Sequence, residues 1–419
     1  MPAQSGEAPP APMADLLNAP HPSGAGFLQR ALAAMRTHLR LQVAYISRFE
    51  GDEAVYREVD APGLEAMIKP GDRRPLDDVY CRHILAGRLP ELMPDTSAEP
   101  LAVQMPITAA VPIGAHVSVP LRLPDGEVYG MFCCLGPAAD PTLNARDLAT
   151  MRTFADLAAH EIAREGEQER SRHRRIHDVR RAIGTGRSCV FQPIWSLAGG
   201  HPIGFEALSR FSGEPPRGPD HWFAEAASLG LGSELELAAV ETALDGLAVL
   251  PPPVYLALNV SPTTIMSADL HKLLAKRPLD RIVLELTEHE VVEEYEAVAA
   301  ILQPLRRRGL RLAADDAGAG YNGLQQILRI KPDLIKLDRA LIVDIHRDPA
   351  KRALAAALAA FSRDTGSRLI AEGVETEDEL VMLRAVGVDS IQGYLLGRPM
   401  PLADAVELTG GTAPQALRA

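Results

Sequence analysis

The chain has 419 residues, of which 47% are hydrophobic, and its formal net charge is -12. A single hydrophobic core seldom grows beyond about 250–300 residues, so we expect two folded domains. The acidic balance argues against a DNA-binding protein with a broad basic face. The longest apolar run, residues 353–361, is much shorter than the ~20 residues of a membrane span.

The N-terminal segment, residues 1–24, is rich in proline and lacks hydrophobic periodicity, so we predict a disordered tail. It shows no basic stretch followed by an apolar one, as a signal peptide would. The four cysteines lack the spacing of a zinc site, which favours a reducing compartment. We therefore expect a cytoplasmic protein with no DNA and no membrane partner.

The next segment, residues 25–165, has the pattern of a small α+β domain. A helix is predicted from about residue 26 to 41 and strands at 42–49, 116–123 and 128–135. The stretches "RRPLDDVYCRHILAGRLPELMPDT", "IGAHVSVPL" and "DGEVYGMFCC" resemble a GAF domain, which is a sensory module. The resemblance implies either a site for an unknown small molecule or a domain that binds no ligand and only dimerises.

A long helix is predicted from about residue 144, and it continues through a linker at 166–186. Every seventh residue shares one stripe of this helix, as in a coiled coil: Leu148, Ala155, Ile162, Glu169, Ile176 and Ile183. The stripe is apolar at both ends and charged in the middle. Two interpretations stay open: a solvated linker helix, or a parallel helix pair that carries a signal within a homodimer.

From Arg187 to residue 408 strands alternate with amphipathic helices, and residues 409–419 form a short tail. The strand-like runs are 189–197, 203–208, 254–260, 282–287, 311–315, 333–337, 368–371 and 390–395. Eight such runs favour a (β/α)8-type barrel, an α/β fold whose active site lies at the carboxyl ends of its strands. The predicted architecture is therefore an α+β domain, a linking helix and a barrel.

Polar residues fall late in these strands or just beyond them. The set comprises Glu206, Arg210, Asn259, Glu285, Glu288, Asp315, Asp316, Lys336, Glu372, Glu375 and Gln392. So many acids at one barrel mouth would repel one another unless they were protonated or neutralised. Carboxylate and amide oxygens suit Mg²⁺ or Mn²⁺ rather than zinc. A pair of such ions, about 3.5–4 Å apart, is a common device for phosphoryl chemistry.

Seven ordered motifs carry a second resemblance: "GFEALSRF", "NVSP", "LELTE", "ADDAGAGY", "DLIKLD", "AEGVET" and "QGYLLGRP". Together they resemble the EAL domain, a phosphodiesterase that linearises cyclic di-GMP to pGpG. The resemblance implies metal ligands at Glu206, Asn259, Glu285, Asp315, Asp316 and Glu372. It implies catalytic roles for Lys336, Glu372 and Gln392, and substrate contacts from Arg210, Gln192 and Leu208. Glu288 and Glu375 would support the ligands from behind.

The loop after the paired aspartates departs from the family pattern. The family usually reads DDFGTGYSSL, whereas this chain has "DDAGAGYNGL". Because the ligand set is complete, we expect an active phosphodiesterase regulated by the GAF domain. The alternative is a catalytically silent receptor that binds cyclic di-GMP and signals through the linker helix.

Overall fold

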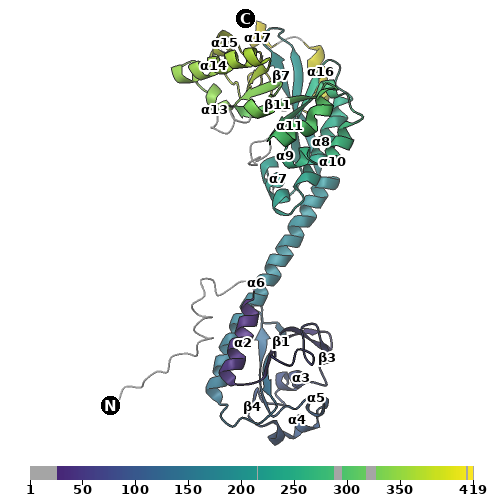
Figure 1. Ribbon diagram of the computed structural model, residues 1–419, viewed down its shortest axis with the longest axis vertical. Coiled ribbons are helices and arrows are strands. Elements are labelled where there is room, and N and C mark those ends of the chain that lie inside the picture. Colours follow the sequence, from purple (N-terminus) through teal and green to yellow (C-terminus); the bar gives the residue numbers. More distant parts are fainter. Residues whose placement is uncertain (1–25, 215, 287–294, 318–326, 412–413, 419) are drawn as a thin grey trace, which may run out of the picture. The chain divides into compact units, whose positions relative to one another are not determined.

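The computed structural model describes residues 26–214, 216–286, 295–317, 327–411 and 414–418. The chain divides into two compact units between Arg172 and His173, and each is described separately below (Figure 1). The predicted tail at residues 1–24 lies outside the described residues. Among the described helices, none is both long and apolar enough to cross a membrane.

The first unit is built on a six-stranded antiparallel sheet in the order β3-β2-β1-β6-β5-β4. Its strands are β1 (Val43–Glu50), β2 (Glu53–Asp60), β3 (Arg73–Pro75), β4 (Leu92–Met93), β5 (Ala115–Arg122) and β6 (Val128–Gly136). Helix α2 (Phe27–Leu39) packs on one face. The other face packs against the segment that contains α3 (Tyr80–Leu85), η1 (Thr96–Ala98), α4 (Pro100–Gln104) and α5 (Pro106–Ala110). The predicted α+β domain is confirmed.

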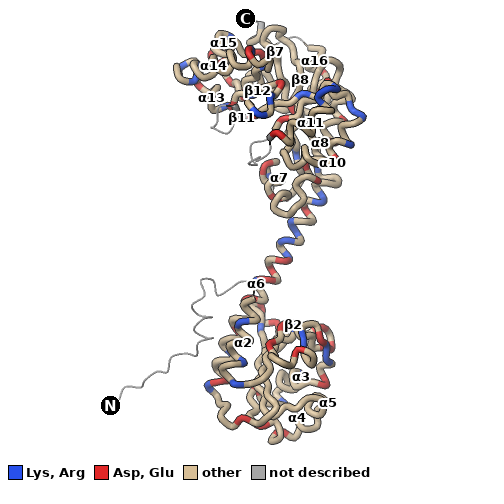
Figure 2. The backbone as a smooth tube through the Cα atoms, viewed as in Figure 1, with Lys and Arg blue, Asp and Glu red and all other residues tan. Residues whose placement is uncertain are grey.

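Helix α6 (Ala145–Gly184) contains 40 residues and carries the predicted heptad stripe. Basic and acidic residues follow one another along its middle (Figure 2). At its start, Ala155 and Ile162 are buried against the sheet of the first unit, in the same core as α2. Near its end, Ile183 is partly buried and packs against a hydrophobic cluster of the second unit. The chain itself therefore covers the apolar ends of the stripe, and the homodimer stays a prediction.

The second unit is a closed barrel in the order β10-β11-β12-β13-β14-β7-β8-β9. Its strands are β7 (Arg187–Ser196), β8 (Pro202–Phe211), β9 (Tyr255–Val260), β10 (Ile282–Leu286), β11 (Arg311–Ala317), β12 (Leu334–Leu337), β13 (Arg368–Ala371) and β14 (Ser390–Ile391). Strand β7 runs antiparallel to both neighbours, while the other pairs are parallel. The five residues between β7 and β8 allow a hairpin but are too few for a helical crossover. The predicted barrel is confirmed, with its first strand reversed.

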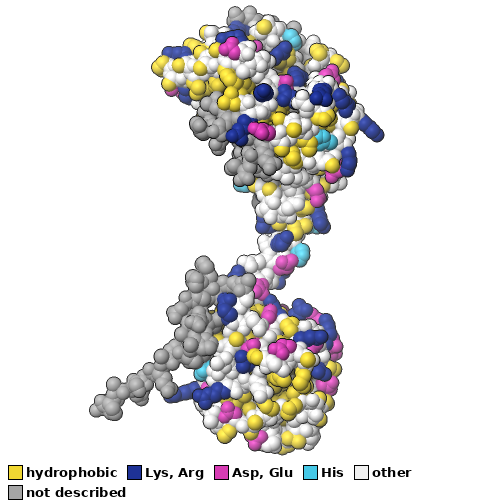
Figure 3. Space-filling view, in the orientation of Figure 1, with side chains coloured by type: hydrophobic (Ala, Val, Ile, Leu, Met, Phe, Trp, Pro, Cys, Tyr) yellow, Lys and Arg dark blue, Asp and Glu magenta, His cyan; other side chains and the backbone are white. Residues whose placement is uncertain are grey.

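Helices surround this barrel, and the strands form its wall (Figure 1). They are α7 (Pro219–Ser228), α8 (Gly232–Leu247), α9 (Pro262–Ile265), α10 (Ala268–Leu274), η2 (Leu279–Arg281), α11 (Tyr295–Arg306), α13 (Arg339–Ile342), α14 (Pro349–Thr365), α15 (Glu377–Val386), α16 (Leu402–Gly410) and α17 (Gln415–Arg418). Two large apolar clusters fill the space between strands and helices, and a smaller one fills the barrel interior. On the face shown in Figure 3, charges of both signs are interspersed with hydrophobic side chains.

Candidate active site

The barrel wall places the polar residues through the two-residue period of its strands. The interior cluster contains Ala257, Val283, Ala313, Leu334 and Ile370. Side chains two residues apart on a strand share a face. The next inward positions on these strands, or just beyond β13, are therefore Asn259, Glu285, Asp315, Lys336 and Glu372. One apolar layer thus closes the barrel interior, and a polar layer lies above it at the carboxyl ends of the strands.

Lys336 lies at the centre of the acids in this polar layer. Its Nζ donates a hydrogen bond to Glu285 Oε2 at 2.9 Å. The same ammonium lies 2.5 Å from Glu372 Oε1, 3.3 Å from Asp315 Oδ1 and 3.9 Å from Glu206 Oε2. The Lys336 side chain is only 1% exposed. Four acids predicted as ligands therefore surround one buried cation.

One ammonium does not neutralise four carboxylates. Burial raises the pKa of Glu285 well above its ordinary value, and the neighbouring acids raise it further despite the lowering effect of Lys336. Burial raises the pKa of Glu372 to about 8, again against Lys336. Burial would lower the pKa of Lys336, but the surrounding carboxylates raise it instead. The site therefore has unmet demand for positive charge.

Two amide side chains donate hydrogen bonds to Glu206, and a third positions one of them. Asn259 Nδ2 donates to Glu206 Oε1 at 2.8 Å, and Gln392 Nε2 donates to Glu206 Oε2 at 2.6 Å. Gln392 Nε2 also lies 3.1 Å from Gln192 Oε1, and Gln192 is the cross-strand partner of Glu206. Burial would raise the pKa of Glu206, but Lys336 and the hydrogen bonds from Gln392 and Asn259 lower it. Glu206 is thus held as an ionised carboxylate.

A close backbone contact fixes Gln392 beside the loop of Glu372. The backbone N–H of Val374 donates to Gln392 O at 3.1 Å. A Cβ atom at Gly393 would lie 2.1 Å from Val374 O, so only glycine fits there. The two segments that follow β13 and β14 are therefore locked together at the barrel mouth.

The donor set fits divalent cations. Within the described ranges, no group of three acids, histidines or cysteines is close enough to hold a metal ion by itself. Carboxylate oxygens from three strands and one following loop nevertheless face one point, with the Asn259 amide beside them. Gln392 Oε1 is buried and has no hydrogen-bond partner among the described residues. Hard oxygen donors and excess negative charge are what Mg²⁺ or Mn²⁺ requires.

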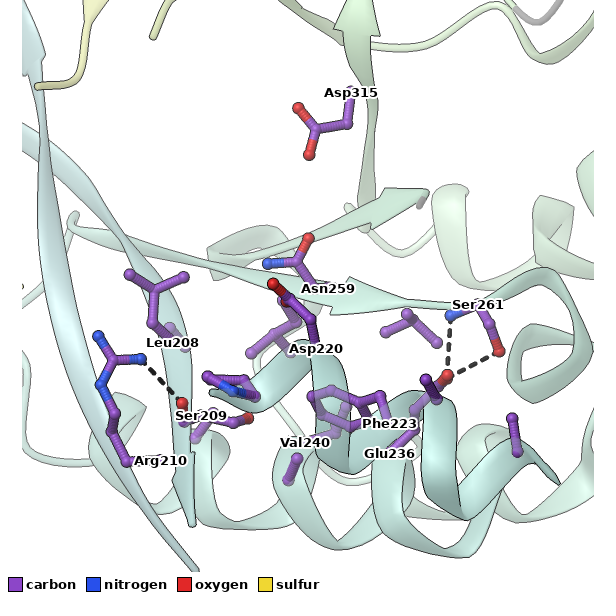
Figure 4. Close-up of a pocket in the computed structure, with 18 residues that line it drawn as sticks. Leu208, Ser209, Arg210, Asp220, Phe223, Glu236, Val240, Asn259, Ser261 and Asp315 are labelled. Carbon is purple, nitrogen blue, oxygen red and sulfur yellow. Dashed lines mark hydrogen bonds between the residues drawn. The ribbon is translucent and has the colours of Figure 1, made fainter. Parts of the chain in front are cut away.

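A cavity of about 650 Å³ opens beside these acids. Figure 4 shows Asp315 on one side of it, with Asn259 and Asp220 pointing into the space above α7 and α8. Leu208 and Arg210 line it from β8, and an Arg210 guanidinium N–H donates to Ser209 O at 2.8 Å. The volume lies in the range of pockets for small ligands, about 300–1,000 Å³. The arginine supplies a cation for an anionic ligand.

The remaining predicted site residues lie in three kinds of place. The side chain of Asp316 and the whole of Glu288 lie outside the described residues, as does most of the loop that departs from the family pattern. Glu375 ion-pairs with Arg339 at 2.9 Å, and its side chain is 42% exposed. Gln192 lies next to Glu206 and donates from Nε2 to Gly397 O at 3.4 Å. The structure thus groups Glu206, Asn259, Glu285, Asp315, Lys336, Glu372, Gln392 and Gln192, with Arg210 and Leu208 on the adjoining cavity.

Sequence reasoning missed two acids that position the site. Glu236 of α8 accepts hydrogen bonds from Ser261 N at 2.9 Å and Ser261 Oγ at 2.8 Å, which fixes the chain just after Asn259. Glu379 accepts from the backbone N–H groups of Asp344, Glu375 and Thr376 and completes a capping box at α15. The Thr376-to-Glu379 spacing is a sequence signature of such a box and could have revealed it.

Glu379→Ala is expected to destabilise the barrel by about 2–3 kcal/mol and to lower turnover, because three backbone donors beside the Glu372 loop would lose a charged acceptor. Glu379 is 4% exposed. Burial would raise the pKa of Glu379, but these hydrogen bonds lower it, so the stabilisation should fade as the pH falls below about 4.5. Thermal unfolding of the exposed-site control Glu377→Ala should match the wild type; equal melting of both variants would contradict the prediction.

Comparison with known families agrees with this geometry. The EAL domain family model matches residues 176–399 and the GAF domain model matches residues 25–163. The first match covers more than half of the chain, and the chain therefore belongs to the EAL domain family, with a GAF domain before it. The fold and the family together define a class that includes cyclic di-GMP phosphodiesterases.

Individual relatives share about half of the chain. An uncharacterized protein of Sinorhizobium fredii is 34% identical over 249 residues, and the cyclic di-GMP phosphodiesterase RocR of Pseudomonas aeruginosa is 31% identical over 239 residues. These matches cover 57% and 54% of this chain but only 30% and 61% of the relatives. A structure of the PaMucR phosphodiesterase in complex with c-di-GMP has a TM-score of 0.50 at 28% identity, and the match covers 55% of this chain and 99% of that one.

Proposed function

We propose that this protein hydrolyses cyclic di-GMP to linear pGpG with two divalent cations, Mg²⁺ or Mn²⁺, at the barrel mouth. The observation that carries the proposal is the convergence of Glu206, Glu285, Asp315 and Glu372 on one point beside a cavity of about 650 Å³. Similarity to RocR and to the PaMucR complex with c-di-GMP supports the choice of substrate.

In this proposal, Glu206, Asn259, Glu285, Asp315, Asp316 and Glu372 hold the cations. When bound, such ions lower the pKa of coordinated water and neutralise charge on phosphoryl oxygens. Gln392 and Asn259 keep Glu206 turned toward the site through hydrogen bonds to both of its oxygens. Lys336 offsets the mutual repulsion of the acids, and its ammonium would help to position and activate the attacking water. The apolar layer beneath closes the barrel interior to water.

The substrate would occupy the cavity between β8, β9, α7 and α8. Arg210 binds a phosphate at its edge, and Leu208, Phe223 and Val240 supply apolar contacts for a nucleoside. The GAF domain regulates the reaction, its own ligand being an unknown small molecule or none. A smaller cavity of about 160 Å³ in the first unit, lined by Tyr45, Tyr56 and His116 among others, is available to a ligand of the GAF domain. The protein acts as a cytoplasmic homodimer.

The direct test is to incubate the purified protein with cyclic di-GMP and Mg²⁺ or Mn²⁺ and to separate the products by chromatography. We expect pGpG to appear and its formation to stop when a chelator removes the cation. Tight binding of cyclic di-GMP without turnover would instead establish the silent receptor. If the protein neither bound nor cleaved cyclic di-GMP, both assignments would be refuted.

Arg210→Ala is expected to raise KM for cyclic di-GMP about 10-fold or more, because a hydrogen bond between charged groups is lost. Arg210 lines the cavity and donates to the backbone of Ser209 rather than to the acids, so kcat should change much less. Steady-state kinetics checks this prediction. The control is Arg368→Ala, because Arg368 lies at the amino end of β13, away from the rim of acids. An unchanged KM in the Arg210 variant would remove it from the substrate site.

A further inference from the structure

Helix α7 has two faces with different partners. Five of its residues line the cavity of about 650 Å³: Pro219, Asp220, Phe223, Ala224 and Ala227. On its other side Trp222 and Ala226 are fully buried, and they pack in one cluster with Val179 and Ala182 of α6. The helix that forms one wall of the substrate cavity therefore also packs against the last turns of α6.

An ion cluster fixes α7 to α6 at this contact. Arg175 Nε of α6 donates to Glu225 Oε1 at 2.7 Å, and Arg217 Nη1 donates to Glu225 Oε2 at 2.5 Å. Arg175 Nη2 also donates to Ser228 Oγ at 2.9 Å. Arginine side chains therefore bind both carboxylate oxygens of Glu225, and Arg175 contacts α7 at Glu225 and at Ser228.

The burial of Glu225 distinguishes this cluster from an ordinary surface ion pair. Its side chain is only 11% exposed. Burial would raise the pKa of Glu225, but the two arginines lower it, so the group stays ionised near neutral pH. The guanidinium of Arg217 lies 4.4 Å from the centre of the Trp222 ring, which orients it toward Glu225. The removal of either partner would leave a nearly buried charge less well satisfied.

We propose that Glu225 is a positioning residue for the substrate cavity, and that Arg175, through Glu225, makes α6 a determinant of the affinity for cyclic di-GMP. A shift of the last turns of α6 would move α7, and with it Asp220, Phe223 and Ala227 at the cavity wall. The acids of the polar layer lie on β8, β10 and β11 and just after β13, and they keep their places. The identity of the nucleotide in this inference rests on the proposed function.

The experiment compares full-length wild-type protein with Arg175→Ala and Glu225→Gln. We expect KM for cyclic di-GMP to rise about fivefold or more in both variants, while kcat changes less than about twofold because the acids are untouched. Amide hydrogen exchange of residues 219–228 should accelerate in the same variants. Arg175→Lys should fall between wild type and Arg175→Ala, because an ammonium keeps the charge but not the two-point contact.

Arg170→Ala is the matched control, since Arg170 lies on the same helix and pairs with the exposed Glu167 at 3.1 Å. Its KM and its exchange should equal those of the wild type. An unchanged KM in Arg175→Ala and Glu225→Gln of an active enzyme would overturn this inference and leave the proposed function intact, even if exchange accelerated. A wild-type protein that neither bound nor cleaved cyclic di-GMP would overturn the proposed function, and the role in nucleotide affinity with it.

Discussion

Turnover of cyclic di-GMP should fall about 100-fold or more in Glu206→Gln, while the barrel remains folded. Even residues that only support a metal ligand cost 10–100-fold when they are replaced, so the loss of a ligand itself should cost at least as much. Glutamine keeps the size of the side chain, and its single oxygen can still accept a hydrogen bond from either Asn259 or Gln392, which both donate to Glu206 in the wild type. Single-turnover assays over a Mg²⁺ titration, with circular dichroism to check folding, measure the effect.

Glu375→Gln is the control for this experiment, because Glu375 pairs with Arg339 and its side chain is 42% exposed. Its turnover should stay within about twofold of the wild type if it takes no part in holding the metal ions. Near-normal turnover of Glu206→Gln at limiting Mg²⁺ would show that Glu206 is not a ligand. A low rate restored by high Mg²⁺ would instead locate the defect in metal affinity.

In metal-free protein, the stability of the barrel should decrease as the pH rises from about 4.5 to 8, and Glu372→Gln should reduce that decrease. Burial raises the pKa of Glu372 to about 8. Between the unfolded value and this one, the folded state holds a proton that the unfolded chain has released, so rising pH favours unfolding. A single group contributes up to about 1.4 kcal/mol per pH unit within this window.

The measurement is the melting temperature of the barrel by calorimetry in the presence of a chelator, at several pH values. Wild type and Glu372→Gln should differ most near pH 8 and converge below about pH 4.5, where the carboxyl group becomes protonated in the unfolded state as well as in the folded one. Added Mg²⁺ should stabilise the wild type most at high pH, where the acids are free to ionise. Parallel pH profiles of the two proteins would show that Glu372 is not the group that titrates.

The sequence predicted the barrel because its strands are visible as short apolar runs that end in polar residues. It also predicted that Glu285 and Asp315 would meet, since the carboxyl ends of parallel strands lie at one rim. The central place of Lys336 among the acids depends on strand order and stagger, which no local pattern encodes. The cluster of Arg175 with Glu225 joins residues fifty positions apart, so only the folded chain reveals it.

The reversed direction of β7 determines at which end of the barrel the preceding helix α6 is attached. The other strands have their carboxyl ends at the rim of acids. Because β7 is antiparallel to its neighbours β14 and β8, its amino end lies at this rim. Helix α6 ends at Gly184 and β7 begins at Arg187, only a few residues before Gln192. A first strand parallel to the rest would have attached the helix at the opposite, closed end of the barrel. The chain thus enters the barrel at the rim of acids, and a torque on the helix would be applied within one strand length of Gln192 and its neighbour Glu206.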